Sequence, residues 1–307
     1  MIYRTRLLVQ EQQLQMVCTK NRQKGCKENM DLDVVVCAKN RAAMLERILE
    51  QINHEIPLRD LIVIYGSSKD GTKEVAERYT RNVFWDEDKG LGSARNLGMR
   101  KASSELVAMI DTDVVLTEDW YKRLVKHFED GKVAAVMGVP IYGYGCRPVQ
   151  RLFEYWRWYN TESWGCSNTI FRRKLVLKVG NFDEEIRGAG EDYDLRKRLK
   201  IAGYRYIWDR KVVVYHPMNL FELLNHISWW SKGAPFIREL ISEVRTYSLF
   251  RIYARFAFQI LDSLREGVRL AFVVHPSTLF LLPMINTVSV AARFKELKKT
   301  LSASPCP

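Results

Sequence analysis

Short apolar runs that alternate with amphipathic segments restrict the fold of this chain more than any other feature of its sequence. Residues 34–38 and 106–110 are apolar at every position, as is typical of strands that are buried on both faces of a parallel sheet. Residues 41–54 carry apolar side chains at helical spacing. This alternation predicts an α/β fold, in which helices flank a mostly parallel, Rossmann-like sheet with right-handed crossovers.

The same patterns give an order of elements. We expect helices at residues 41–54, 72–79, 92–102, 118–130, 173–179 and 191–202, with Thr72 as the N-cap of the second one. We expect strands at residues 34–38, 61–65, 82–85, 106–110, 133–139, 166–171, 205–208 and 212–215. Ligands of parallel sheets bind beyond the carboxyl ends of the strands. The polar clusters of the first 216 residues fall at these ends.

The strongest candidate for chemistry is Asp111-Thr112-Asp113, which directly follows the apolar run 106–110. Two carboxylates one residue apart at a strand end can share a hard cation, Mg²⁺ or Mn²⁺, and the diphosphate that the cation neutralises. One carboxylate would bind the metal, and the other would reach a ribose hydroxyl or a metal-bound water. In a loop such a triplet would be an ordinary acidic turn, but its place at a strand end favours the metal site.

A second acidic cluster, which includes Glu191 and Asp192, begins the helix expected after the glycine-rich loop 188–190. Acidic side chains stabilise a helix N-terminus through the helix dipole, so a structural role would explain them. The loop can also place Asp192 over a pocket. There its carboxylate would take the proton from an acceptor hydroxyl as that hydroxyl attacks an anomeric carbon.

Two further residues have suitable positions. His216 ends the last expected strand, a placement that suits a third metal ligand. Arg95 follows the flexible segment 90–92 and would meet a nucleotide or its phosphates. The tryptophans of residues 153–159 and Trp164 would stack on a sugar, although core packing or membrane contact explains them equally well.

In their order these pieces resemble glycosyltransferase family 2, with a GT-A fold. The resemblance covers residues 31–217 and implies inverting transfer from a nucleotide-diphosphate sugar to an acceptor hydroxyl. It implies that Asp113 binds the metal, that Asp111 lies near the metal and the ribose, and that Asp192 is the base, with Glu191 beside it. The segments that carry it are the early strand with Lys39-Asn40-Arg41, SSKDGT at 67–72, KGLGSARNLGMRKASSELVAMIDTDVVL at 89–116, NTIFRRKLVLKVGNFDE at 168–184, GEDYDLRKRLKIAGY at 190–204 and VVVYHP at 212–217.

The donor nucleotide would be bound along the first strand-to-helix loops. The residues assigned to it by the resemblance are Lys39, Asn40, Arg41, Ser68, Asp70, Arg95 and Asp111. One departure matters here. After the second strand many relatives have an Asp that contacts the base or the ribose, and this chain has Tyr65-Gly66. The base of the nucleotide is therefore left open, with altered contacts through Lys39 or Asp70 as one alternative.

The C-terminal ninety residues have a different character. Residues 218–307 hold eleven Lys/Arg against six Asp/Glu, and the stretch 270–292 has no charged residue. About 20 apolar residues suffice to span a bilayer, but His275, Pro276 and Pro283 interrupt this stretch. Basic residues flank both of its ends, contrary to a positive-inside bias, so a re-entrant or interfacial helical pair against anionic headgroups fits better. A soluble helical appendage and a dimerisation hairpin are the alternatives.

We therefore predict a basic N-terminal extension (1–30), a catalytic domain (31–217) and a C-terminal helical, membrane-associated or oligomerisation segment (218–307). The net charge of +12 would attract a polyanion. The cytoplasmic face of a membrane would account for it and would make a lipid-linked acceptor plausible beside a polysaccharide one. Six cysteines without metal-ligand spacing are typical of a reducing compartment, without a disulfide or a zinc site.

Two other classes of protein compete with the transferase. A sugar nucleotidyltransferase would carry a glycine-rich phosphate loop after the first strand, where residues 37–41 contain no glycine. A non-catalytic membrane or nucleic-acid binding protein on a decayed transferase fold would explain Tyr65-Gly66. The retention of Asp111, Asp113, Asp192 and His216 speaks against decay. No nucleic acid is expected as a partner, because no recognition motif accompanies the charge.

Overall fold

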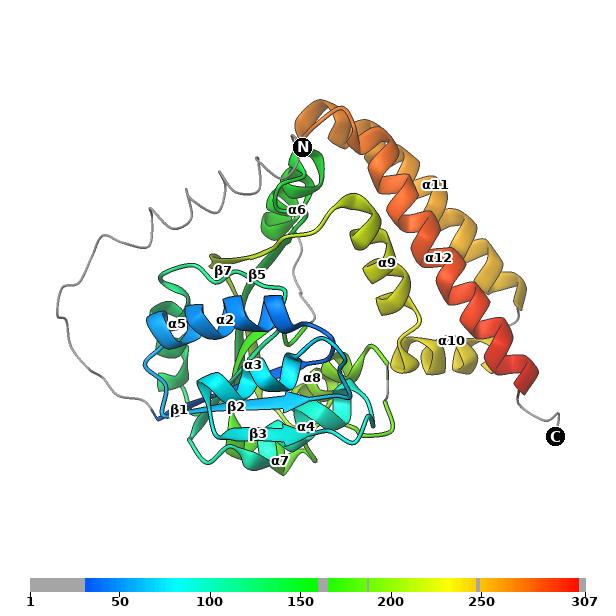
Figure 1. Ribbon diagram of the computed structural model, residues 1–307. Coiled ribbons are helices and arrows are strands. Elements are labelled where there is room, and N and C mark those ends of the chain that lie inside the picture. Colours follow the sequence, from blue (N-terminus) through cyan, green and yellow to red (C-terminus); the bar gives the residue numbers. More distant parts are fainter. Residues whose placement is uncertain (1–30, 160–164, 187, 247–248, 304–307) are drawn as a thin grey trace.

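The computed structural model describes residues 31–159, 165–186, 188–246 and 249–303, and a seven-stranded sheet lies at its centre (Figure 1). The strands are β1 (Leu32–Ala38), β2 (Asp60–Tyr65), β3 (Asn82–Trp85), β4 (Leu106–Ile110), β5 (Val133–Tyr142), β6 (Asn168–Arg172) and β7 (Arg205–His216). Their order is β3-β2-β1-β4-β6-β5-β7, and only β6 runs antiparallel to its neighbours. The expected mostly parallel α/β sheet is confirmed.

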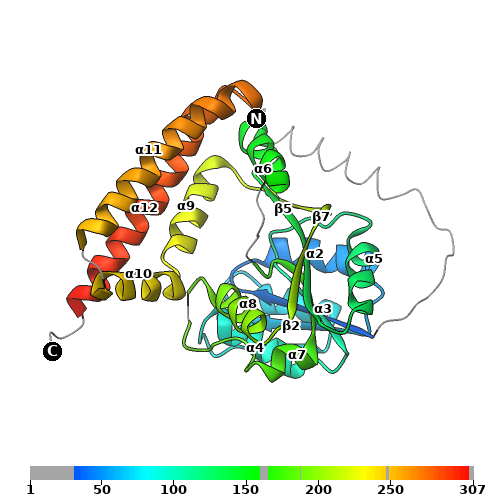
Figure 2. The same cartoon turned by 180° about the vertical axis from the view of Figure 1, so that it is seen from behind.

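The helices are α2 (Ala42–Glu55), α3 (Thr72–Tyr79), α4 (Leu91–Lys101), α5 (Trp120–Leu124), α6 (Arg147–Tyr159), α7 (Arg173–Lys178), α8 (Glu191–Ile201), α9 (Leu220–Ser231), α10 (Ala234–Thr246), α11 (Leu249–Val273) and α12 (Thr278–Ala303). A 3₁₀ turn, Val125–Glu129, follows α5. Successive residues of a strand point to opposite faces of the sheet. Val34 and Val36 accordingly pack with α2, α3 and α5, whereas Val35 packs on the face of α4, α7 and α8 (Figure 2).

Four expectations about individual elements were wrong. The helix expected at 118–130 is a short α-helix followed by the 3₁₀ turn. The two strands expected at 205–208 and 212–215 are one strand with an irregular register opposite Gly138, and β5 continues to Tyr142 rather than ending at 139. Thr72 is not an N-cap, because the left-handed Gly71 holds that position and Thr72 begins the helix. Its hydroxyl oxygen instead accepts a hydrogen bond from the Arg41 amide at 3.0 Å.

All elements described after β7 are helical (Figure 1). The stretch 270–292 comprises the end of α11, a turn and the first half of α12, so it forms part of a hairpin. None of the helices in the described ranges has both the length and the apolar character needed to cross a bilayer. The predicted basic extension 1–30 and Trp164 lie outside the described residues.

Candidate active site

The Asp111–Asp113 segment leaves the carboxyl edge of the sheet between two strands that hold it in place. The Asp111 amide donates to the Ser167 carbonyl at 2.9 Å, beside the start of β6. Two residues beyond Asp113, Val115 forms a bridge with Tyr215 near the end of β7. Because β7 ends one residue later, at His216, these pairings bring His216 Nδ1 to 3.8 Å from Asp113 Oδ1.

His216 has the environment of a neutral metal ligand. Its side chain is buried, and burial lowers its pKa even though Asp113 opposes the shift. Its Nε2 lies 3.3 Å from Ser167 Oγ, while Nδ1 has no hydrogen-bond partner among the described residues. With the proton on Nε2, the ring offers the Nδ1 lone pair toward Asp113. A hydrogen bond at one ring nitrogen commonly orients the other toward a metal.

The types of side chain at this edge therefore fit a divalent cation: two hard carboxylates and one imidazole. The carboxylates of Asp111 and Asp113 are partly exposed, so they are open to a ligand from solvent. Across the described ranges, however, no three His, Cys, Asp or Glu side chains are already grouped closely enough to hold an ion. The three predicted ligands thus lie in one region without forming a closed ligand set.

Arg95 connects this edge to the second acidic cluster. Its side chain is only 4% exposed; Nη1 donates to Glu191 Oε1, and Nη2 donates to Asp111 Oδ1 at 2.9 Å. Arg95 was predicted to meet the nucleotide, but its guanidinium lies between two carboxylates. Since a buried charge is costly without a partner, each of these side chains depends on the others.

A glycine allows this contact. An added Cβ at Gly92, in the first turn of α4, would lie 2.8 Å from the Asp183 carbonyl oxygen and 2.9 Å from that of Ile186. Real Cβ atoms are not found so close to backbone oxygens. Helix α4 can therefore approach the loop that leads into α8, and this approach brings Arg95 to Glu191.

Glu191 and Asp192 begin α8 at the same edge. Glu191 is buried, and burial raises its pKa, while the charge of Arg95 acts in the opposite direction. Burial also raises the pKa of Asp192, and the charge of Arg95 again opposes the shift. Asp192 is itself half-buried, and its Oδ1 accepts a hydrogen bond from the Tyr193 amide at 2.7 Å. A carboxylate with a raised pKa is a stronger base than an ordinary one.

The residues predicted for the donor nucleotide in the first two loops lie close together. The Asn40 amide donates to Ser68 Oγ at 2.9 Å, and Asn40 Oδ1 accepts from the Lys69 amide at 3.0 Å. Asp70 Oδ2 accepts from the Ala42 amide at 3.0 Å. Arg41, the N-cap of α2, provides no side-chain cap, so Asp70 satisfies a free amide of α2 from the neighbouring loop. These side chains fix the shape of the two loops.

Lys39 pairs with Asp88, a residue that was not predicted from the sequence. Its Nζ lies 2.7 Å from Asp88 Oδ1, and Asp88 also accepts from the amide and the hydroxyl of Ser67. The hydrogen bonds from Lys39 and Ser67 lower the pKa of Asp88 to about 2. Asp88 lies beside Gly66, since an added Cβ on Gly66 would be 3.3 Å from its Oδ1. A carboxylate from another loop thus lies next to the position where the expected Asp is absent.

Tyr142 was also missed. It ends β5, and its ring centroid lies 4.6 Å from that of His216. Burial raises its pKa, so the phenol is neutral. The expected end of this strand at residue 139 hid its position, because β5 runs beside β7 as far as the Tyr142–His216 pair. The ends of β5 and β7 therefore both lie at the site, whereas only the end of β7 was predicted there.

Known proteins share both the sequence pattern and the fold. Residues 33–180 match the family model of glycosyl transferase family 2. The chain is 25% identical over 245 residues to the glycosyltransferase AglE of Haloferax volcanii, a match that covers 74% of this chain and 77% of AglE. It is 29% identical over 203 residues to the pre-mycofactocin glycosyltransferase of Mycobacterium tuberculosis, covering 61% of this chain and 42% of that protein.

A third relative is the poly-beta-1,6-N-acetyl-D-glucosamine synthase of Staphylococcus aureus, 26% identical over 233 residues, with 67% of this chain and 55% of that protein covered. The chain thus spans less than two thirds of the length of two of these three relatives. Among solved structures, the mannosyltransferase PcManGT of Pyrobaculum calidifontis, in complex with GDP-Man and Mn²⁺, has a TM-score of 0.59 at 18% identity, over 95% of this chain and 94% of that one. This likeness shows the GT-A fold. Residues 33–180 therefore form a glycosyl transferase family 2 domain, and the chain is a glycosyltransferase.

Proposed function

We propose that the chain transfers a sugar from a nucleotide-diphosphate donor to an acceptor hydroxyl with inversion at the anomeric carbon. A divalent cation, Mg²⁺ or Mn²⁺, would be held by Asp113 and His216, with Asp111 beside it. Asp192 would act as the base. The solved mannosyltransferase of the same fold contains GDP-Man and Mn²⁺, which supports a donor and a cation of these classes.

The observation that carries this proposal is the double ion pair of Arg95. Through it, the carboxylate of Asp111 after β4 is tied to Glu191 at the start of α8. The first residue of the proposed metal segment and the residue before the proposed base are thereby held at a fixed separation. A fixed separation is needed for a reaction in which the leaving group and the attacking hydroxyl lie on opposite sides of one carbon.

When bound, the cation would neutralise charge on the diphosphate as it leaves. The chain's own residues would act on the acceptor, whose hydroxyl attacks the sugar. The acceptor oxygen forms a bond to the anomeric carbon, its proton passes to the Asp192 carboxylate, and the bond from that carbon to the diphosphate oxygen breaks with its electron pair. Attack opposite the leaving group inverts the configuration. Arg95 would position Asp111 and Glu191 rather than contact the sugar.

The donor base and the acceptor are less closely defined. Lys39, Ser67 and Asp88 form one hydrogen-bonded group beside Gly66, and we infer that this group would face the base or the ribose. The family relatives include a polysaccharide synthase, which supports a glycan acceptor beside a lipid-linked one. The division into a catalytic domain at 31–217 and a helical segment at 218–307 stays a prediction.

The test is transfer or donor hydrolysis across a panel of GDP-, UDP- and other nucleotide sugars, with Mn²⁺, with Mg²⁺ and with EDTA. We expect one nucleotide class to be turned over, only with a cation present, and Asp113→Asn to abolish the cation dependence together with the activity. Asp119→Asn is the matched control, because Arg123 is the one side chain that pairs with this exposed carboxylate among the described residues. Turnover in EDTA that Asp113→Asn leaves unchanged would contradict the proposed metal site.

A further inference from the structure

Helix α11 exposes a row of large apolar side chains along the side that faces away from its neighbours. The row consists of Phe250, Phe258, Leu261, Val268 and Phe272. Phe250 is 78% exposed and Phe272 is 88% exposed. These positions recur at helical spacing, so they share one side of the helix. We call this row the outer face of α11. A contiguous apolar surface of this kind on a soluble domain commonly marks a site of interaction.

The outer face is not a core surface that has lost its packing. The opposite side of α11 supplies Ile252, Phe256 and Leu270 to buried clusters with α10, α12 and α9. An added Cβ at Gly267 would lie 3.1 Å from the Thr278 carbonyl oxygen and 3.2 Å from that of Leu279, so the two helices of the hairpin touch near the turn. The hairpin therefore has its own core and holds the outer face as a preformed surface.

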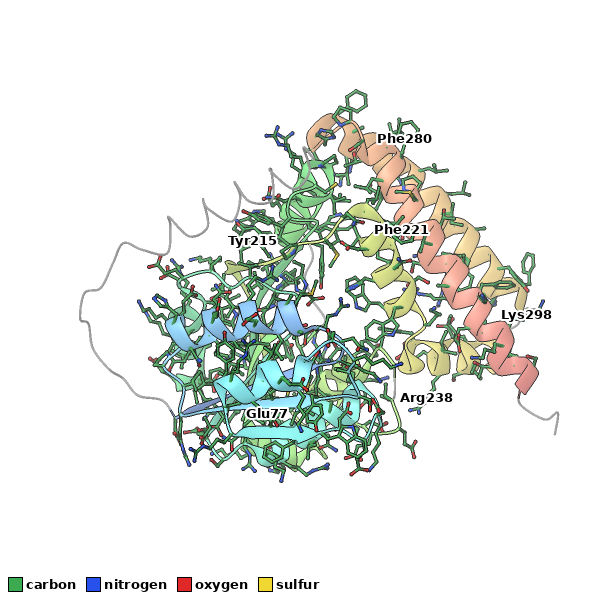
Figure 3. The ribbon with its side chains drawn as sticks, in the orientation of Figure 1. Glu77, Tyr215, Phe221, Arg238, Phe280 and Lys298 are labelled. Carbon is green, nitrogen blue, oxygen red and sulfur yellow. The ribbon has the colours of Figure 1, made fainter. Side chains whose placement is uncertain are left out.

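The hairpin presents this face away from the catalytic sheet. Helix α12 packs against α9 and α6, which leaves α11 on the outside (Figures 1 and 2). At the end of the hairpin, Phe280 of α12 is 74% exposed and extends the apolar surface past the turn (Figure 3). With 25 residues, α11 is about 37 Å long at ~1.5 Å per residue.

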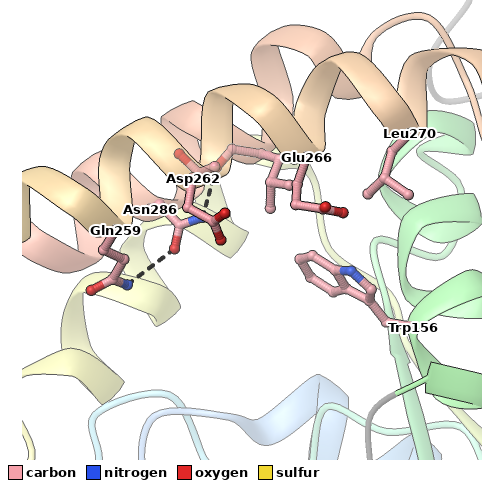
Figure 4. A pocket seen from close by; sticks show the side chains of 8 residues that line it. Trp156, Gln259, Asp262, Glu266, Leu270 and Asn286 are labelled. Atoms are coloured by element: carbon pink, nitrogen blue, oxygen red, sulfur yellow. Dashed lines mark hydrogen bonds between the residues drawn. The ribbon is translucent and has the colours of Figure 1, made fainter.

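Basic and acidic side chains of α11 lie at different positions around the helix. Arg265 is exposed among the apolar positions, and Arg251 lies along one edge. Beyond this edge, Asp262 and Glu266 turn toward Trp156 of α6, where they line a cavity of about 310 Å³ (Figure 4). Glu266 is paired with Arg269 at 2.8 Å, so this arginine lies on the acidic side, whereas Arg251 and Arg265 border the apolar row.

We propose that the outer face of α11, together with Phe280, docks on the surface of an anionic lipid bilayer. Phenylalanine side chains with arginines at their border suit the boundary between acyl chains and anionic headgroups. A second copy of this chain fits less well, because docking the same face on itself would bring the arginines of two chains with a net charge of +12 together. Asp262 and Glu266 fix the orientation, since they lie on the edge turned away from the lipid.

The experiment measures binding of the full chain to phosphatidylcholine vesicles with and without phosphatidylglycerol, by co-sedimentation at low and high salt. We expect binding only to the anionic vesicles and weaker binding at high salt. Phe272→Asp should weaken it by roughly tenfold or more, because it puts a charge where an apolar side chain would enter the lipid. Ile201→Asp is the matched control, since Ile201 is 78% exposed, against 88% for Phe272, but lies at the end of α8 on the catalytic domain.

Equal loss of vesicle binding in both variants would attribute binding to net charge alone and would overturn the proposal, as would no binding by the unaltered chain. Light scattering without lipid tests whether a second copy of the chain binds to this face instead. A dimer that Phe272→Asp converts to a monomer would assign the face to a second copy instead. Donor hydrolysis, measured in both variants, should stay unchanged, since neither residue belongs to the active site. Retained hydrolysis also shows that the variants are folded.

Discussion

The active site and the hairpin differ in which groups they withdraw from water. At the carboxyl edge of the sheet, charged groups such as Arg95 and Glu191 are buried, while in the hairpin large phenylalanines such as Phe272 are exposed. Each arrangement costs free energy in an isolated chain, because a buried charge loses hydration and an exposed aromatic ring orders water. Each is stabilised by a different partner: the buried charges by one another, and the exposed rings by a surface outside the chain.

This difference explains what a mutation should do in each region. In the active site, the partners belong to the same chain, so removing one destabilises the fold and the chemistry together. On the outer face of α11, the proposed partner is external, so a substitution there should affect docking and leave stability nearly unchanged. The predictions below test this separation.

The largest effect should come from Asp192→Asn. An amide cannot accept the acceptor proton as a carboxylate does, so kcat should fall by about 10²–10⁴-fold, while Asp119→Asn stays near the unaltered rate. Steady-state transfer with the donor identified in the panel is the measurement. Unchanged transfer would mean that Asp192 is not the base.

Next in size is Arg95→Met, which leaves Glu191 buried without its partner. Breaking one side of a buried ion pair costs about 3–5 kcal/mol, which urea unfolding would reveal as a lower midpoint. The double variant Arg95→Met/Glu191→Gln should recover part of the loss, because the remaining group is neutral. If the double variant is no more stable than Arg95→Met, the pair does not stabilise the fold in the way inferred.

Gly92→Ala should cost about 1–3 kcal/mol of stability, as for overpacking, and should lower kcat because α4 moves away from the loop before α8. Gly131→Ala is the control, since an added Cβ there meets nothing within 4 Å. The two variants are compared by denaturant unfolding and by transfer rate. Equal stability of the two would show that the loop yields to the new methyl group.

A smaller effect concerns pH. Burial raises the pKa of Asp192 above its ordinary value of 3.8, and only the ionised form accepts a proton. The kcat/KM for transfer should therefore fall about tenfold per pH unit below this raised pKa, with its acid limb at higher pH than for an ordinary Asp. A profile that stays flat down to pH 4 would contradict a raised pKa at the base.

The smallest effect should be on the stability of the hairpin variant Phe272→Asp, within about 0.5 kcal/mol, as for most surface substitutions. Phe256→Ala, on the inner side of the same helix, should cost about 3–5 kcal/mol. Both are read from urea unfolding monitored by circular dichroism. A large loss in Phe272→Asp would mean that the outer face packs within the chain, and the comparison between the two regions would fail.

Much of the sheet could be predicted because its strands are buried on both faces. Apolar runs such as 106–110 therefore stand out from their surroundings. The direction of β6 could not be predicted in this way, because β6 is buried at every position, like the parallel strand β4. The site segments followed from strand ends, which explains why Asp111 and His216 were found and why Tyr142, beyond a misjudged strand end, was missed.

The ion pairs between side chains of the site could not be predicted from the sequence. Arg95 and Glu191 are separated by 96 positions, and Lys39 and Asp88 by 49. Nothing local in the sequence indicates that these side chains meet, because the contacts depend on how α4 and the loops pack. The outer face of α11 was hidden for a related reason. Membrane contact was predicted from the uncharged stretch 270–292, around the turn. The exposed apolar row lies mostly before this stretch, along 250–272.

The carboxylate of Asp111 is bound by Arg95 and would also lie beside the proposed metal, so it affects the order in which ligands bind. Both of its oxygens already accept from Arg95 Nη2, at 2.9 and 3.3 Å, so an ion arriving alone competes with a guanidinium for the same oxygens. An ion that carries a diphosphate brings negative charge toward that guanidinium and offsets the competition. Under the proposed mechanism, the free enzyme would bind a bare cation weakly, and metal and donor would enter as one complex before the acceptor.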